Sequence, residues 1–209
     1  MFKTSYLFII SGLLVVADQV TKFIFKGVNF MGIYVEGWEL GETKEVFGDY
    51  FTFTFVENPG MAFGIEFGAG KILLSLFSVF ASFGLIWYLK KIEFAHKGIR
   101  TGIMLILSGA VGNMIDRVFY GVIYGESALF YGKVVDFLRV DIPDMFGMTH
   151  WPVFNIADAC VSVGIVLLII FNSKLPNLNE AKAGKYIIDF DENNESNMNQ
   201  DLEKINEEV

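Results

Sequence analysis

Four stretches without charged residues determine what this chain can fold into. No Asp, Glu, Lys or Arg occurs in residues 4–17, 72–89, 101–115 and 159–173, although 19% of the whole chain is charged. A helix needs about 20 predominantly apolar residues to cross the roughly 30 Å core of a bilayer. The apolar pattern continues beyond each stretch, so the sequence predicts an all-α integral membrane protein with four transmembrane helices, at about 4–26, 70–90, 99–119 and 153–173.

The rest of the composition excludes several classes of protein. A single cysteine, Cys160, cannot form an internal disulfide framework or a cysteine-based zinc site. The net charge is −8 and the longest basic run is the pair Lys90 and Lys91, so we expect no nucleic-acid partner. Residues 174–209 are rich in Asn and Glu and poor in apolar side chains. They are therefore predicted to form a disordered acidic tail after a membrane domain of residues 1–173.

The charges between the helices predict the orientation in the membrane. Lys90, Lys91, Lys97 and Arg100 lie in or next to the short link between the second and third helices, whereas the loop at 27–69 is mainly acidic. Short loops rich in Lys and Arg stay in the cytoplasm. Both termini are therefore expected in the cytoplasm, and the loops at about 27–69 and 120–152 outside. The alternation in residues 51–55 (FTFTF) predicts a small external β-element in the first loop.

Several carboxylates gather at one depth of the predicted bundle. With a rise of about 1.5 Å per residue, Asp18, Asp116 and Asp158 all lie about 21–24 Å from the cytoplasmic ends of their helices. Asp136 follows in the second external loop, between apolar neighbours. An ionisable group at such a depth costs several kcal/mol unless it is paired or hydrated. These four carboxylates therefore need partners or a function.

Two of the four have partners close in the sequence. Asp18 and Lys22 have the i, i+4 spacing of a helical ion pair, and Asp116 adjoins Arg117, so a structural role is the simpler interpretation for both carboxylates. Asp136 and Asp158 have no such neighbour. The residues alone leave two interpretations equally open for them, a catalytic carboxylate pair or an ion-handling site.

A close carboxylate pair can hydrolyse a peptide without a metal or a nucleophilic side chain. Two neighbouring carboxylates cannot both ionise easily, so they share a proton. One member can then deprotonate a water while the other protonates the carbonyl oxygen, as in aspartic proteases. Asn58, Asn113 and Asn155 bring amides to the same layer. Each amide alone is typical of helix packing, but their convergence favours a site that holds a peptide backbone.

Five short motifs, in order, resemble those of the lipoprotein signal peptidase (signal peptidase II) family. They are Asp18-x-x-x-Lys22, Asn58-x-Gly60-x-Ala62-Phe63, Gly112-Asn113-x-x-Asp116-Arg117, Val135-Asp136-Phe137 and Phe154-Asn155-x-Ala157-Asp158. Each motif is weak alone, but the ordered set with four spans in matching places is specific. The resemblance extends over about residues 5–173.

The resemblance implies an aspartic endopeptidase of the bacterial inner (cytoplasmic) membrane, with its active site near the outer face. Such an enzyme removes signal peptides from prolipoproteins, cutting before a cysteine that carries diacylglycerol, and it is inhibited by globomycin-type peptides. It works without a cofactor or metal. By motif position, Asp136 and Asp158 correspond to the catalytic dyad. The implied substrate- and inhibitor-binding residues are Asn58, Gly60, Asn113, Arg117, Asn155 and Ala157. The implied structural residues are Asp18, Lys22 and Asp116.

Three features depart from the family pattern: the long acidic first loop, the acidic tail, and an insertion at residues 121–132. The insertion precedes Asp136, so it calls the local geometry of that residue into question. A small proton-coupled transporter or channel that uses the carboxylate cluster as its relay is the alternative function. The gathering of polar residues at one interface, with the opposite halves of the helices nearly free of ionisable groups, favours the peptidase.

Overall fold

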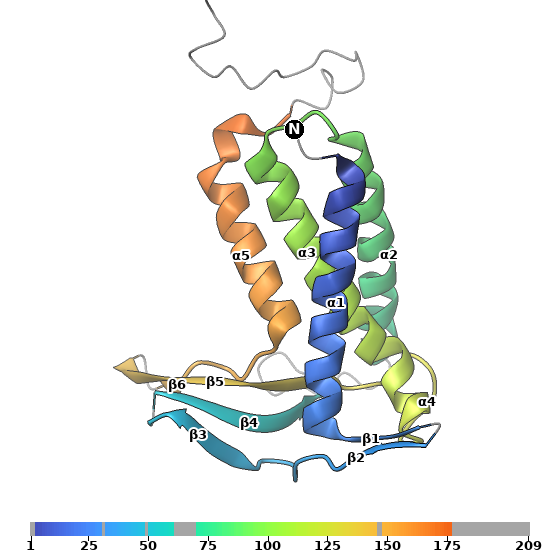
Figure 1. Ribbon diagram of the computed structural model, residues 1–209, viewed down its shortest axis with the longest axis vertical. Coiled ribbons are helices and arrows are strands. Elements are labelled where there is room, and N and C mark those ends of the chain that lie inside the picture. Colours follow the sequence, from blue (N-terminus) through green and yellow to red (C-terminus); the bar gives the residue numbers. More distant parts are fainter. Residues whose placement is uncertain (1–2, 31, 49, 61–69, 146–147, 177–209) are drawn as a thin grey trace, which may run out of the picture.

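The computed structural model describes residues 3–30, 32–48, 50–60, 70–145 and 148–176, and it is mostly helical (Figure 1). Among these residues, three helices are long and apolar enough to cross a membrane. They are α1 (Thr4–Lys26), α2 (Gly70–Lys91) and α3 (Lys97–Ile115), and α3 continues through a π-helical segment, η1 (Asp116–Tyr120), into the short α4 (Gly121–Ile123). A shorter apolar helix, α5 (Ile156–Ile170), is followed by a 3₁₀ turn, η2 (Asn172–Lys174).

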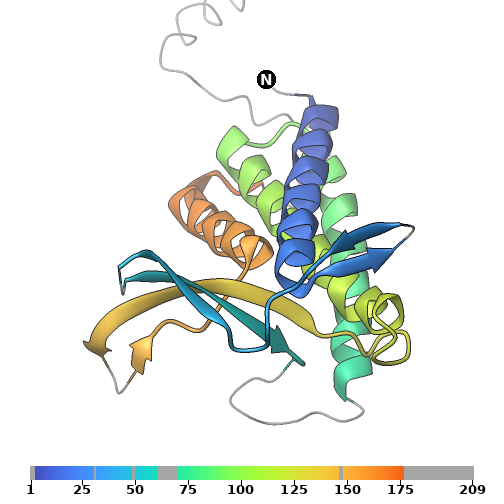
Figure 2. The same ribbon diagram turned by 60° about the horizontal axis from the view of Figure 1, so that its bottom comes forward.

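Two antiparallel sheets lie at one end of the helices. The small sheet pairs β1 (Val28–Phe30) with β2 (Ile33–Val35). The larger one has the order β3-β4-β5-β6, formed by β3 (Thr43–Phe47), β4 (Phe51–Asn58), β5 (Val134–Met145) and β6 (Met148–His150). Figures 1 and 2 show the larger sheet crossing the end of the bundle, with β5 running beneath the helices. The start of α1 and the end of α5 lie at the opposite end.

The helix predictions agree with the structure for the first two segments and differ for the last two. The third helix continues past residue 119, because η1 and α4 extend it to Ile123. The fourth runs from Ile156 to Ile170 and is 15 residues long, shorter than predicted at both ends. It begins late because Phe154 forms a β-bridge with Leu138, so the chain is still extended there, and Asn155 then caps the helix.

The predicted fold class contains too little β-structure. The strand at 51–55 is confirmed as β4, but it belongs to a four-stranded sheet rather than to a small element. The 12-residue β5 was predicted as part of a loop, because its sequence VVDFLRVDIPDM mixes charges and a proline with apolar residues. The predicted acidic tail lies almost wholly outside the described residues.

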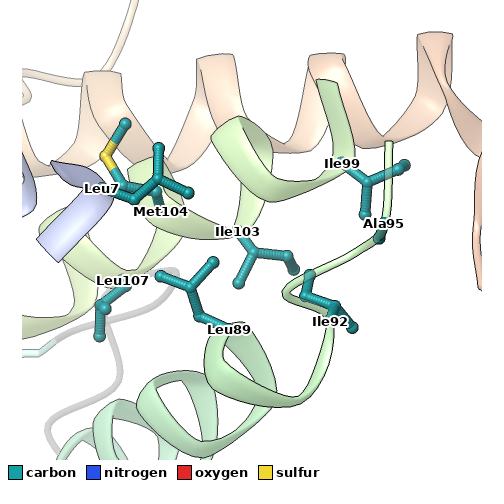
Figure 3. Packing of buried hydrophobic residues seen from close by; sticks show 8 residues of the cluster. All are labelled: Leu7, Leu89, Ile92, Ala95, Ile99, Ile103, Met104 and Leu107. Atoms are coloured by element: carbon teal, nitrogen blue, oxygen red, sulfur yellow. The ribbon is translucent and has the colours of Figure 1, made fainter. Parts of the chain in front are cut away.

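Two separate clusters of apolar side chains stabilise the two ends of the bundle. The cluster far from the sheet joins α1, α2, the α2–α3 link and α3 (Figure 3); its buried residues are Leu7, Leu89, Ile92, Ala95, Ile99, Ile103, Met104 and Leu107. The cluster at the sheet end is mainly aromatic and includes Phe25, Phe55, Tyr120 and Phe137. The rings of Phe25 and Phe137 stack at 4.3 Å, which fixes the end of α1 against β5.

Small residues allow α3 to lie close to α5. A Cβ atom at Gly109 would be 2.2 Å from the carbonyl oxygen of Ala157, and one at Gly164 would be 2.7 Å from that of Gly102. Close backbone approach at small residues is typical of helix packing in membranes. The outward faces of α1, α2 and α5 carry exposed apolar side chains such as Leu13, Phe77 and Ile169, as expected of helices that face lipid.

Candidate active site

Asn155 brings the two predicted catalytic carboxylates together. Its side-chain Nδ2 donates to Asp136 Oδ1 at 2.7 Å, and its backbone N–H donates to Asp158 Oδ2 at 3.3 Å. Its Oδ1 accepts from the backbone N–H of Asp158 at 2.9 Å, which completes a capping box at the start of α5. Asp136 lies on β5 and Asp158 lies in the first turn of α5, so one buried residue connects strand and helix at the carboxylates.

Asn113 on α3 connects this pair to a buried ion cluster. Its Nδ2 donates to Asp158 Oδ1 at 2.8 Å. Its Oδ1 accepts from Lys22 Nζ at 3.0 Å and from Asn155 Nδ2 at 3.1 Å. Both polar atoms of the Asn113 side chain therefore hydrogen-bond to residues that the sequence predicted at the site.

Lys22 holds the structural carboxylates at the centre of the bundle. Its ammonium contacts Asp18 Oδ2 at 2.9 Å, which confirms the predicted i, i+4 pair, and Asp116 Oδ2 at 2.7 Å. The partner of Asp116 is thus Lys22, rather than its sequence neighbour Arg117. Asp116 Oδ2 also accepts from the backbone N–H of Val135 at 3.2 Å, which ties the start of β5 to the cluster.

Gln19 and Tyr120 belong to the same network, although the sequence analysis did not single them out. Gln19 Nε2 donates to Asp18 Oδ2 at 3.1 Å and to Asp116 Oδ1 at 3.0 Å, and its Oε1 accepts from Tyr120 Oη at 3.0 Å. An amide beside an aspartate within a predicted span was the available signal for Gln19. Nothing in the sequence distinguished Tyr120 from the many other aromatic residues.

Asn58 and Gly60 shape the end of β4 beside Asp136. The register places Val56 opposite Asp136 and Asn58 opposite Val134, and the Asn58 side chain hydrogen-bonds to Asp136. Asn58 Oδ1 also accepts from the Gly60 N–H at 2.9 Å. Gly60 has φ +85°, and a Cβ there would be 2.7 Å from Leu74, so this turn requires glycine. Ala62 and Phe63 of the same motif lie outside the described residues.

Arg117 and Ala157, also predicted to bind substrate, occupy different surroundings. Arg117 lies in η1, where its Nη1 donates to Ser78 Oγ at 3.3 Å and its charge acts on Asp136 and Asp158. The buried Nε of Arg117 has no hydrogen-bond partner in the described part of the chain. Ala157 is buried, and its backbone N–H donates to Asp18 Oδ1 at 2.9 Å. The structure therefore places Ala157 at the contact of α5 with α1 and α3.

The insertion at 121–132 packs against η1 before the chain enters β5. It folds back on η1, since Phe130 N–H donates to Val118 O and Gly132 N–H donates to Arg117 O, both at 3.0 Å. A Cβ at Gly132 would lie 2.0 Å from the carbonyl oxygen of Asp116, so the chain returns in close contact with η1 before β5 begins.

A second ion cluster, outside the site, joins the end of α1 to β4 and to the insertion at 121–132. Lys26 pairs with Glu57 on β4 and with Glu126 of the insertion, and Lys133 pairs with Glu57 at 2.6 Å. Burial opposes ionisation of Glu57, but its hydrogen bonds to the two lysines outweigh that effect and lower its pKa. The ends of α1 and β4 and the start of β5 are therefore joined.

The electrostatics of Asp136 suit proton transfer. Burial, followed by repulsion from Asp158, raises the pKa of Asp136 to about 7, while Lys22, Asn58 and Asn155 act in the opposite direction. A carboxyl group with a pKa near neutrality can hold a proton at rest and release it during a reaction. Within the described residues, no group of three or more His, Cys, Asp and Glu side chains could hold a metal ion. The arrangement suits general acid–base chemistry by two carboxyl groups.

Comparison with known proteins extends the similarity over most of the chain. Residues 10–173 match the protein family described as Signal peptidase (SPase) II. A lipoprotein signal peptidase of Porphyromonas gingivalis is 34% identical over 189 residues, covering 76% of this chain and 78% of that protein. One of Amoebophilus asiaticus is 36% identical over 180 residues, covering 76% of this chain and 73% of that protein.

A solved structure has the same fold. It is described as a bacterial membrane enzyme determined by the in meso method, and it superposes with a TM-score of 0.61 at 29% sequence identity. The match covers 82% of this chain and 95% of that one.

Proposed function

The chain belongs to the signal peptidase II family of aspartic peptidases, whose substrates are prolipoproteins, and on that premise we propose that Asp136 and Asp158 are its catalytic dyad. The proposal depends on one observation: Asn155 hydrogen-bonds to both carboxyl groups, through its side-chain Nδ2 to Asp136 and through its backbone N–H to Asp158. A single rigid residue between two acids from a strand and a helix supports a pair that works as one unit.

The proposed reaction is hydrolysis of the peptide bond before the lipidated cysteine. One carboxylate takes a proton from a water molecule, and the water oxygen attacks the scissile carbonyl carbon. The other carboxyl group gives its proton to the carbonyl oxygen, which forms a neutral tetrahedral diol. When this diol collapses, the C–N bond breaks, the first carboxyl group gives its proton to the leaving amine, and a diol hydroxyl returns its proton to the second carboxylate as the C=O bond re-forms. Both peptide products and the shared proton are then accounted for.

The substrate is proposed to be a prolipoprotein whose cysteine carries diacylglycerol, with globomycin-type peptides as competitors for the same site. Asn58 and Gly60 are proposed to meet the peptide backbone, because they lie at the end of β4 beside Asp136. Arg117 has donor groups beyond its bond to Ser78, and a guanidinium suits ester or phosphate oxygens. Asn113 and Asn155 hydrogen-bond to Asp158, and Ala157 is the buried residue that precedes it.

We also propose that α5 spans the membrane with α1, α2 and α3, in the inner membrane of a bacterium. Its 15 residues rise about 22 Å, and the turn of η2 lengthens it. Both the start of α1 and the end of α5 lie opposite the sheet. This supports two cytoplasmic termini, external sheets, and an active site at the outer face, where acyl chains stay in lipid while the peptide meets water.

Cleavage of a diacylated prolipoprotein peptide by the purified full chain tests the proposal. Asp136→Asn and Asp158→Asn should each reduce kcat at least about 1,000-fold, because each removes a general acid–base group. Asp141→Asn is the matched control, since Asp141 lies on the same strand and pairs with Arg139 instead. This variant should keep full activity. Full activity of either dyad variant would contradict the assignment.

A further inference from the structure

We propose that Lys22 and Asn113 are positioning residues that determine which carboxyl group of the dyad is charged. Asp158 is the ionised member, which takes the proton of the water. Asp136 is the protonated member, which gives its proton to the carbonyl oxygen. This inference rests on the dyad assignment proposed above and goes beyond it by giving each carboxyl group one role.

The orientation of the Asn113 amide is fixed by its neighbours. An ammonium has only donors, so Lys22 at 3.0 Å requires the oxygen of Asn113 to face it. The Nδ2 of Asn155 is also a donor and lies 3.1 Å from the same atom, so this atom must be the oxygen of Asn113. The Nδ2 of Asn113 must therefore point the other way, toward Asp158 Oδ1 at 2.8 Å. Because Lys22 is fully buried between two aspartates, it cannot turn to another partner.

The surroundings of Asp158 favour its charged form. Both of its oxygens accept from fixed donors, Oδ1 from Asn113 and Oδ2 from the backbone N–H of Asn155. It also lies in the first turn of α5, where the helix dipole stabilises a negative charge. The side chain is only partly buried, so it keeps more of its hydration than Asp136. A proton on either oxygen would weaken one of these bonds.

The surroundings of Asp136 favour its neutral form. Asp136 is 3% exposed. Besides Asn58, its donor is the Asn155 amide at 2.7 Å, which also faces the oxygens of Asn113 and Val135, so the two protons of that amide serve three acceptors. Its pKa of about 7, raised by burial and by Asp158, agrees with this assignment.

Among the residues that the structure describes, the cations around the pair do not offset a second negative charge in it. Lys22 from α1 is already shared by Asp18 of α1 and Asp116 of η1. Arg117 of η1 acts on Asp116 as well as on Asp158 and Asp136, and β4 contributes only the neutral Asn58. Lys22 and Arg117 together balance Asp18 and Asp116, so one ionised member of the dyad leaves one uncompensated negative charge and two ionised members would leave two. The pair is therefore expected to hold one proton, and it lies on Asp136.

Infrared spectroscopy of the membrane-embedded full chain tests the role of each acid without turnover. Wild type near pH 6 should show the C=O stretch of a buried carboxylic acid. Asp136→Asn should remove this band. Asp158→Asn should retain it and shift its titration to lower pH, since the repelling charge is gone. A band that disappears in Asp158→Asn and persists in Asp136→Asn would overturn the assignment.

The positioning role is tested by the pH dependence of cleavage. The acidic limb of kcat/KM reports the group that must be ionised, and its midpoint should rise by about one pH unit in Asn113→Ala, because a hydrogen bond to the charged form is lost. Asn113→Asp keeps an acceptor for Lys22 but replaces the donor with a negative charge, so its shift should be larger in the same direction.

Ser108→Ala is the matched control. Ser108 lies on the same helix and donates to Ser11 Oγ at 3.0 Å, so its removal also deletes a buried hydrogen bond between α3 and α1. It should leave the acidic limb unchanged. If both Asn113 variants cleave more slowly but the midpoint of the acidic limb of kcat/KM does not change, the role of Asn113 is merely structural and the inference is overturned. Lack of cleavage by wild type would instead contradict the proposed function, while the infrared result would still report the protonation of each acid.

Discussion

The two ends of the helical bundle are stabilised by opposite means. Far from the sheet, apolar side chains such as Leu89 and Ile99 are fully buried against one another. At the sheet end, Lys22, Asp18 and Asp116 are buried just as completely, and they are joined by hydrogen bonds and ion pairs. Buried charges add little stability over apolar packing, but removing one partner is strongly destabilising. We infer that the apolar end supplies most of the stability, whereas the polar end at the sheet holds the carboxylates in position.

The largest effect on stability is expected from Lys22→Met, which removes the cation of the polar end. It leaves Asp18 and Asp116 buried without their cation, so the free energy of unfolding should fall by about 3–5 kcal/mol. Thermal unfolding in detergent measures the loss. Adding Asp18→Asn and Asp116→Asn to Lys22→Met should restore much of it, because no uncompensated charge then remains. A melting temperature unchanged by Lys22→Met would contradict the ion cluster.

A smaller loss, without a change in chemistry, is expected at the apolar end. Leu89→Ala should lower the free energy of unfolding by about 2–4 kcal/mol through the cavity it leaves. The kcat of the folded fraction and its pH profile should stay those of wild type. Leu73→Ala, at an exposed position on the same helix, is the control and should change neither quantity. An altered pH profile in Leu89→Ala would show that the two ends are not independent.

The smallest effect concerns pH and a single carboxyl group. The pKa of Asp136 is about 7 in the folded chain and about 3.8 otherwise, so the folded state binds more protons between these values. Stability should therefore fall as pH rises, by about 2 kcal/mol between about pH 5 and pH 7. Asp136→Asn should remove this part of the slope, whereas Asp141→Asn should not. Calorimetry at several pH values measures it, and equal slopes in wild type and Asp136→Asn would contradict the raised pKa.

The sequence predicted the helices better than the sheet, and the ion pair within one helix better than the ion pair between helices. Uncharged runs located α1 and α2 closely, because a bilayer demands both length and apolarity. The i, i+4 spacing of Asp18 and Lys22 is a local signal, and the structure confirms that pair. The pairing of Lys22 with Asp116 depends instead on the packing of α1 against α3, so no local pattern could indicate it.

The π-helical turn could not be predicted from local sequence either. In η1 the consecutive residues Asp116 and Arg117 turn to different helices, Asp116 to Lys22 on α1 and Arg117 to Ser78 on α2. A π-turn changes the angular spacing of a helix, and no residue in DRVFY signals it. The late start of the fourth helix is also explained by a tertiary contact, the bridge between Phe154 and Leu138.

The backbone bond from Ala157 to Asp18 has a consequence for the order of events during synthesis. These residues are 139 positions apart, and Ala157 belongs to the last helix that the structure describes. Asn155, which begins that helix, also holds both carboxyl groups. A nascent chain with α1, α2 and α3 already inserted therefore still lacks the assembled pair. With Asp136 and Asp158 as the proposed dyad, the ribosome must finish nearly the whole membrane domain before the protein can cut a peptide bond.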